Sequence, residues 1–287
     1  MWHQLCQSGG PQDVRPQLLR QLGVYGGAQG IWVDKARTSA LSDDATGLTV
    51  GLLHTGQHYP DDFSESGVLY HYPETGRPAG RDRSEIEATK AAGIHGLPVF
   101  VITRPSGGST FRDVYLGWIE SWDDESKLFL VTFGDEPEQR TPMEVRDDEP
   151  FDLTETADRR TRESTARAGQ QRFKFRVFKR YGSQCALCGI DVKAVLDAAH
   201  IRPKKQHGSD DPRNGLVLCA TYHRAFDNGL IAIDPNNLTI CCQKNGPDLA
   251  ALAVTMARID FLKAKPHKEA LEWAWQHWLQ QGSAGPE

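Results

Sequence analysis

The sequence lacks long apolar runs and has few cysteines. No stretch approaches the ~20 consecutive apolar residues that a membrane-spanning helix requires, and the start, Met1 to Ser8, has no basic region followed by an apolar one. The six cysteines among 287 residues do not follow the spacing of a small disulfide scaffold. We therefore expect a cytoplasmic protein that is neither secreted nor membrane-bound, with its cysteines buried or bound to a metal.

A net positive charge, which is common among proteins that bind nucleic acid, is also absent. The formal net charge is −5, but between Thr156 and Asp234 there are 15 Lys and Arg against 8 Asp and Glu. Phosphate contacts add affinity only where cations gather, so this half is the part expected to bind a polyanion. Two basic clusters stand out there: Arg172, Lys174, Arg176, Lys179 and Arg180, then Arg202, Lys204 and Lys205.

Length and composition predict two domains joined by a linker. A chain of 287 residues is long enough to bury two cores. Residues 1–22 show little periodicity and are expected to form a loose lead-in with one short helix. Residues 136–168 carry an acidic run followed by arginines, with little apolar content, which is typical of a solvated linker.

The two larger stretches differ in pattern, and together they predict an α+β fold class. Residues 23–135 contain short β-like runs separated by glycine and therefore predict a mostly β domain with one main helix. Residues 169–287 combine short strand-like runs with amphipathic helical ones. Helices are expected at Ile86–Ala92, Gln170–Tyr181, Ala251–Leu262 and Lys268–Leu279.

The stretch from Cys185 to Asp234 carries the residues best suited to catalysis. His200 closes a short apolar run, Asn214 lies in a loop, and His223 opens a helix-like segment after a strand-like one. Histidine can accept a proton near neutral pH or ligate a metal, and Asp227, four residues after His223, shares its helix face. The order His, Asn, His in strand, loop, strand and helix resembles the HNH family of ββα-metal nucleases.

That resemblance implies hydrolysis of DNA phosphodiester bonds with a divalent metal such as Mg²⁺, Mn²⁺ or Co²⁺. His200 would be the general base, Asn214 would hold the loop in place, and His223 and Asp227 would bind the metal. The position before the base usually carries a metal-binding Asp or His in this family, but here it is Ala199. A degenerate HNH fold that does not cleave is therefore one alternative. Asp197, on the same strand face as Ala199, is a candidate substitute ligand.

Three cysteines occupy places where many HNH domains carry a structural zinc site. They are Cys185, Cys188 and Cys219, whereas the expected fourth position is Tyr222. Structural zinc normally requires four ligands. Two alternatives remain open: zinc completed by Cys241 or Cys242, or cysteines kept as buried small apolar residues.

The first domain carries looser motifs that resemble the SRA (YDG) family. The stretches Thr55–Asp62 and Gly67–Arg77, together with Tyr115–Trp118, follow that family's order. The resemblance covers residues 23–135 and implies a PUA-like β-barrel that flips modified cytosine, above all 5-methylcytosine, out of the duplex.

An extruded base needs aromatic faces and polar groups for its edge. The resemblance assigns stacking to Tyr59 and Tyr72 and assigns recognition of the exocyclic amine to Asp62, with Asp61 as the competing carboxylate. The alternative is that the tyrosines are half-buried strand residues and that the two acidic residues form a turn after Pro60.

Together the two resemblances predict a modification-dependent restriction endonuclease that acts on double-stranded DNA. Two alternatives are kept: a modified-DNA reader with a non-cleaving HNH fold, and an HNH nickase of unmodified DNA whose first domain binds something else. An apolar stripe near the C-terminus is expected to pack against the nuclease domain, with a homodimer contact as the alternative. Its residues are Leu271, Trp275, Trp278 and Leu279.

Overall fold

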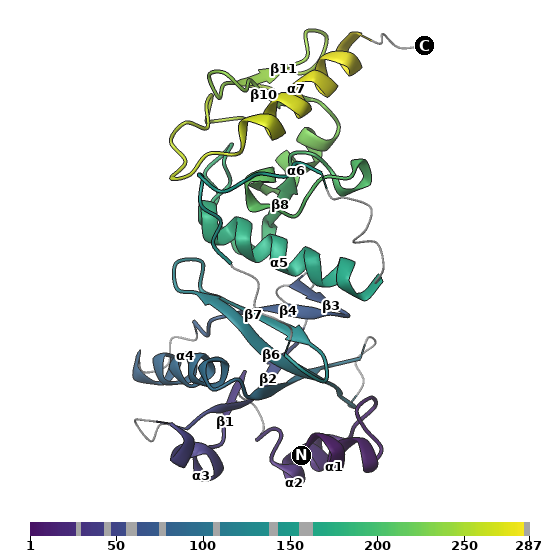
Figure 1. Ribbon diagram of the computed structural model, residues 1–287, viewed down its shortest axis with the longest axis vertical. Coiled ribbons are helices and arrows are strands. Elements are labelled where there is room, and N and C mark those ends of the chain that lie inside the picture. Colours follow the sequence, from purple (N-terminus) through teal and green to yellow (C-terminus); the bar gives the residue numbers. More distant parts are fainter. Residues whose placement is uncertain are drawn as a thin grey trace. The chain divides into compact units, whose positions relative to one another are not determined.

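The chain forms two compact units, Met1–Thr141 and Pro142–Glu287. The computed structural model describes residues 1–26, 30–42, 47–55, 62–74, 79–105, 110–137, 143–154 and 163–283. Each unit mixes helices and strands (Figure 1), so the α+β fold class is confirmed. Within the described ranges, no helix is both long and apolar enough to cross a bilayer.

The first unit is built on a curled seven-stranded sheet with the order β1-β2-β5-β6-β7-β4-β3. All neighbours are antiparallel except β2 and β5, which run parallel. The chain between these two strands includes the long helix α4, which provides the crossover that parallel strands need. Among the described pairings, β1 and β3 are the two edges of this sheet. The strands are β1 (Ile31–Val33), β2 (Thr49–His54), β3 (Phe63–Ser64), β4 (Gly67–His71), β5 (Pro98–Thr103), β6 (Asp113–Asp123) and β7 (Leu128–Phe133).

Both faces of this sheet are covered by other parts of the unit, which explains why β5 is apolar on both sides. Val99 and Val101 pack with Ala92 of α4 (Ala79–Ile94), whereas Phe100 and Ile102 belong to a second core. That core contains side chains from α1 (Trp2–Gln7) and α2 (Pro16–Leu22). Two short helices, α3 (Lys35–Thr38) and η1 (Ser39–Leu41), follow β1.

Two expectations for this unit need correction. Residues 1–22 are not a loose lead-in, because Leu5, Val14 and Leu19 are buried in the second core. Helix α4 is also longer than the expected Ile86–Ala92 and continues through Gly93. Packing of one helix face against β2 and β6 sustains it beyond the region that the sequence pattern identified.

The second unit contains a ββα element. Strands β8 (Leu196–His200) and β9 (Gly215–Cys219) form an antiparallel hairpin, and α6 (Ala220–Asp227) follows directly. Helix α5 (Glu163–Tyr181) packs on the hairpin so closely that a Cβ at Gly215 would lie 2.6 Å from the Val177 side chain. The remaining elements are η4 (Lys193–Val195), η5 (Lys204–Gln206), η6 (Pro212–Asn214), β10 (Ile231–Ile233), β11 (Ile240–Cys242) and α7 (Lys268–Ser283).

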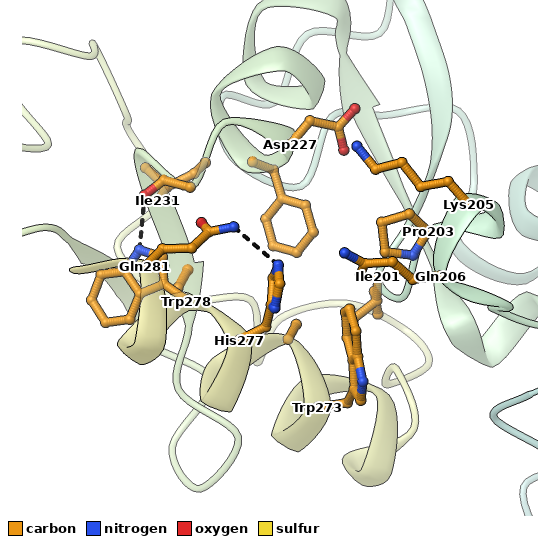
Figure 2. A pocket seen from close by; sticks show the side chains of 14 residues that line it. Ile201, Pro203, Lys205, Gln206, Asp227, Ile231, Trp273, His277, Trp278 and Gln281 are labelled. Carbon is orange, nitrogen blue, oxygen red and sulfur yellow. Dashed lines mark hydrogen bonds between the residues drawn. The ribbon is translucent and has the colours of Figure 1, made fainter. Parts of the chain in front are cut away.

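Helix α7 packs along β10 and uses much of its apolar stripe inside this unit. Leu271 is buried, and the indole of Trp278 donates a hydrogen bond of 2.9 Å to the carbonyl oxygen of Gly229 (Figure 2). Leu279 is the one exposed side chain among the four stripe residues, all of which the structure describes. Leu271 and Trp278 therefore pack within this unit as expected, and the homodimer contact stays a prediction.

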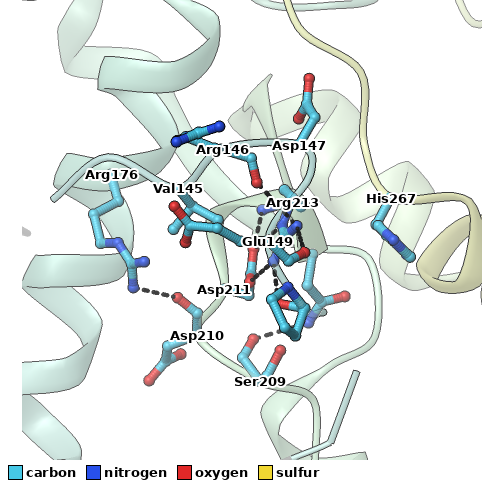
Figure 3. A network of polar contacts seen from close by, with 12 residues as sticks. Val145, Arg146, Asp147, Glu149, Arg176, Ser209, Asp210, Asp211, Arg213 and His267 are labelled. Carbon is cyan, nitrogen blue, oxygen red and sulfur yellow. Dashed lines mark hydrogen bonds and ion pairs between the residues drawn. The ribbon is translucent and has the colours of Figure 1, made fainter. Parts of the chain in front are cut away.

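Part of the expected linker is anchored to the second unit. Arg213, whose side chain is 1% exposed, donates hydrogen bonds to the carbonyl oxygens of Arg146, Glu149 and Pro150 (Figure 3). The same guanidinium pairs with Asp211 at 2.8 Å. Residues 143–154 are therefore held through their backbone, a contact that their charged side chains do not reveal.

The helix expected at Ala251–Leu262 does not form. Thr255 and Met256 donate backbone hydrogen bonds to the Leu187 carbonyl, and Ile259 donates to Leu238. These pairings with distant segments take the donors that a helix would have used internally. Residues 251–262 therefore form an irregular segment that pairs with distant parts of the unit, and we call this segment the strap.

Candidate active site

His200 lies at the end of β8, where two side chains fix its imidazole. Its Nε2 is 3.0 Å from Oδ1 of Asp210, and the Phe173 ring stacks on it at a centroid distance of 3.6 Å. The second Asp210 oxygen accepts from Lys204 Nζ at 2.8 Å. Burial opposes ionisation of Asp210, but the hydrogen bonds from His200 and Lys204 outweigh it and hold its pKa below the ordinary value. An ionised Asp210 fixes the proton on Nε2, which leaves Nδ1 to accept a proton.

Asn214 holds the loop that follows His200. Its Nδ2 donates to the carbonyl oxygens of Arg202 and Ser209, and its Oδ1 accepts from the Arg202 amide at 2.9 Å. The loop is tight, since a Cβ at Gly208 would lie 1.8 Å from the Arg202 carbonyl oxygen. Asn214 thus fixes the chain at Arg202 and Ser209, near the His200–Asp210 pair, and its role is to position the loop.

His223 on α6 forms a second polar group, with a carboxylate at each ring nitrogen. Nδ1 is 3.2 Å from Asp197 Oδ2, and Nε2 is 3.7 Å from Asp227 Oδ2. The hydrogen bond with Asp197 raises the pKa of His223, burial opposes it, and Asp227 adds to the rise. Asp197 therefore orients the ring so that Nε2 faces Asp227, an outer-sphere arrangement common for metal-binding histidines.

The residues around His223 fit a hard divalent cation. One imidazole nitrogen and the Asp227 carboxylate could supply two ligands, and cations such as Mg²⁺ keep several waters beside one or two carboxylates. Ala199 is buried and offers no ligand. Asp197, considered above as a substitute for it, contacts His223 Nδ1 in this arrangement.

Cys185, Cys188 and Cys219 form a compact group of potential metal ligands. Their sulfur atoms all lie within 4.8 Å of one another, and the Cys219 amide donates to Cys185 Sγ at 3.2 Å. Burial, with Cys185 nearby, raises the pKa of Cys188 to about 12. A bound cation would be needed to keep these thiols ionised, so the donor set suits zinc.

None of the expected fourth zinc ligands joins this group in the part of the chain that the structure describes. Cys241 and Cys242 lie on β11, outside the three-cysteine group. The hydroxyl of Tyr222 donates to the carbonyl oxygens of Leu252 and Ala253 at 3.0 and 2.6 Å. Tyr222 therefore ties the strap to α6 at the place where the fourth cysteine was expected.

Not every cation of the two basic clusters is available to a phosphate. Arg176 donates to the Asp210 carbonyl oxygen at 3.3 Å. Arg180 pairs with Asp147 and also donates to the carbonyl oxygens of Val145 and Lys265. The side chains of these two arginines stabilise the structure around the site. The expectation that the whole first basic cluster binds DNA is therefore limited to its other members.

Two of the four predicted base-binding residues, Asp62 and Tyr72, belong to the described part of the first unit, but the structure does not bring them together. Tyr72 is 8% exposed, packs on Phe129 and donates its hydroxyl to Asp124 at 2.9 Å. Asp62 lies 2.6 Å from Nε2 of His71, whose side chain points to the opposite face from its neighbour Tyr72. Tyr59 and Asp61 lie outside the described residues.

Phe63, the residue that follows Asp62, belongs to a group of aromatic side chains. The Phe63 ring lies 5.2 to 5.4 Å from the rings of His54, Tyr115 and Phe133. All four side chains are partly exposed. The sequence does not predict this cluster because its members come from four different strands. It also does not predict the contact of Asp210 with His200, because the course of the loop between them brings the two side chains together.

Comparison with known proteins identifies the domain that holds the catalytic candidates. Residues 185–234 match the HNH endonuclease family, a match that covers less than a fifth of the chain and includes His200, Asn214 and His223. The expected HNH domain is thereby confirmed. No curated protein matches the chain.

Two solved structures of restriction endonucleases are similar to the chain. One is the modification-dependent TagI restriction endonuclease, with 18% identity, 93% of this chain and 92% of that chain covered, and a TM-score of 0.33. The other is the Type IV phosphorothioation-dependent restriction endonuclease ScoMcrA, with 14% identity, 94% and 59% covered, and a TM-score of 0.30.

Proposed function

We propose that the protein is a metal-dependent endonuclease that hydrolyses phosphodiester bonds in DNA. The observation that carries this proposal is the pairing of His200 with Asp210 beside a ββα element whose helix presents His223 and Asp227. These side chains match the needs of the reaction, which are a base for water, a metal site and a rigid frame. The HNH match supports the same conclusion.

In this reaction, His200 takes the proton of the attacking water at Nδ1. Asp210 keeps the Nε2 proton in place and stabilises the imidazolium that forms, while Asn214 prevents the loop from shifting. As the water oxygen bonds to phosphorus, the opposite phosphorus–oxygen bond breaks. His223 and Asp227 would hold a divalent cation, which would supply charge neutralisation for the phosphate and the leaving oxygen.

For the first unit, the proposal is recognition of modified cytosine, in the first place 5-methylcytosine, by base flipping from double-stranded DNA. Its support is the motif resemblance, together with two features of the same unit: the Asp62 carboxylate, which pairs with His71, and the group of partly exposed aromatic rings around Phe63. Tyr59 and Asp61 remain proposed base contacts. Tyr72 would act from within the core, as a support for the sheet that carries this surface.

A plasmid cleavage assay tests the nuclease. Wild-type protein with Mg²⁺, Mn²⁺ or Co²⁺ should convert a supercoiled methylated plasmid to linear DNA, and the metal chelator EDTA should stop it. His200→Ala should leave the plasmid intact. Absence of cleavage with every metal would favour the other candidate function, a modified-DNA reader, which the buried Ala199 favours. Nicked product from unmethylated DNA would identify a nickase.

A further inference from the structure

A pocket of about 110 Å³ opens beside Asp227, between η5 and α7 (Figure 2). It lies entirely within the second unit. Aromatic rings form much of its wall, while charged and amide groups stand among them. The side chains that matter here are Lys205, Gln206, Asp227, Trp273, His277 and Trp278.

The aromatic wall is held in place by its own contacts. Trp278 is anchored to Gly229 by its indole hydrogen bond, and the His277 ring lies nearly parallel to Trp273 at 14°. The amide of Gln281 is 3.0 Å from His277 Nε2. Because these contacts fix the orientation of the rings, a ligand would meet a preformed wall.

Gln206 provides a polar group without a partner. Its Oε1 is buried and accepts no hydrogen bond from any described residue, and Figure 2 shows the nitrogen end of the same amide pointing into the pocket. An unsatisfied buried acceptor is unfavourable, so a ligand that donates an N–H there would remove that cost. Lys205, exposed at the same pocket, adds a positive charge suited to a phosphate.

We propose that this pocket receives one pyrimidine base of the cleaved strand, unstacked from its neighbours beside the scissile phosphate. The inference rests on the proposed nuclease function, because Asp227 lines the pocket and is also the proposed metal ligand. A base bound here therefore lies next to the reacting phosphate. Aromatic walls replace the stacking that the base loses, and Gln206 Oε1 accepts from the thymine N3–H or the cytosine amine.

The size of the pocket selects the single-ring bases. An apolar cavity of about 150 Å³ holds one benzene molecule. A pocket of about 110 Å³ that is open on one side is closer to the size of one six-membered ring, whose sugar stays outside, than to the size of the fused rings of a purine. Thymine and cytosine are therefore the expected occupants.

Equilibrium binding to short single strands tests the pocket without requiring cleavage. The protein is the full chain carrying His200→Ala, and the probes are fluorescein-labelled strands of equal length and charge at fixed salt. One probe is fully abasic, one carries a single central thymine, and one carries a single central adenine. The thymine probe should bind about ten-fold more tightly than the other two, as expected for one base stacked on aromatic side chains.

Four further variants separate the pocket from the rest of the surface. Trp273→Ala and Gln206→Ala should reduce the thymine preference, whereas Trp273→Phe should retain most of it. The matched control is Phe261→Ala, which removes an exposed aromatic side chain of the same unit outside the pocket and should retain the preference. Equal affinity for all three probes, a preference for adenine, or equal losses in Trp273→Ala and Phe261→Ala would overturn the proposal.

Failure of the pocket and failure of the nuclease give different results. If wild-type protein cleaves plasmid but shows no thymine preference in the binding series, the pocket proposal alone is wrong. If no metal supports cleavage but Trp273→Ala still abolishes a thymine preference, the pocket binds a base and the nuclease assignment is wrong.

Discussion

At the residue scale, the pairing of His200 with Asp210 is the contact on which hydrolysis should depend. General base catalysis contributes typically about 10²- to 10⁴-fold to the rate. His200→Ala should therefore lower the single-turnover cleavage rate by about that factor while DNA affinity stays near the wild-type value, since a base acts on water. A variant that cuts at a near wild-type rate would show that another group removes the proton.

Asp210 should contribute to stability in a pH-dependent way. Its pKa is lowered in the folded state, so its contribution is present above the ordinary aspartate pKa and is lost as the pH falls through the lower folded value. Asp210→Asn should melt at a lower temperature than wild type at neutral pH, and the two should converge in acid. Thermal melts across this range measure the difference. A gap that is equal at both ends would mean that charge is not the cause.

The sequence identified His200, Asn214 and His223 because their order along a strand, a loop and a helix is specific. It could not identify Asp210 as the partner of His200, since the contact is made by a loop that Asn214 and Gly208 fold back. The role of Asp197 was similarly ambiguous. Its strand face was evident, but only its distance to Nδ1 of His223 distinguishes an orienting group from a direct ligand.

At the scale of elements, the buried Arg213 should fix residues 143–154 to the second unit. Arg213→Met removes the partner of Asp211 and leaves several carbonyl oxygens without their donor. Loss of one partner of a buried pair costs about 3–5 kcal/mol, and urea unfolding should detect it. The control is Arg258→Met, which breaks an exposed pair with Asp260 and should cost no more than about 1 kcal/mol. Equal effects would refute the anchoring role.

The three-cysteine group predicts a second structural dependence. Purified protein should carry about one equivalent of zinc, and chelation should unfold the second unit, because metal-binding energy is then folding energy. Cys188→Ser should lower the zinc content, whereas Cys241→Ser should not, since Cys241 lies outside the group. Zinc-free protein that still melts cooperatively would identify the cysteines as core thiols.

Among the elements, most of the longer regular ones were predictable and the short or irregular ones were not. The longer strands of the first unit and most of α5 and α7 follow from the sequence pattern, whereas α1, α3 and β3 were not expected. The strap at Ala251–Leu262 also looked helical, but its backbone donors pair with Leu187 and Leu238 instead. The anchored connector was missed for a related reason: the groups that the buried Arg213 binds are backbone carbonyls, which no side-chain pattern reports.

At the scale of the whole molecule, residues 1–22 belong to the first unit. The fragment that should fold alone is therefore Met1–Thr141 and not a piece that begins at residue 23, which would lack the buried Leu5 and Leu19. We expect the longer fragment to melt cooperatively and to bind a duplex with one 5-methylcytosine more tightly than its unmodified counterpart at fixed salt. Asp62→Ala should erode this discrimination. Equal affinity for the two duplexes would contradict the reader assignment.

The division of labour between the two units is the central claim, and one cleavage comparison tests it most directly. Two plasmids of identical sequence, differing only in cytosine methylation, are incubated with wild-type protein and Mg²⁺, Mn²⁺ or Co²⁺. The account predicts that only the methylated plasmid is linearised and that His200→Ala linearises neither. Equal cleavage of both plasmids would contradict modification-dependent recognition, and no cleavage of either would contradict the nuclease.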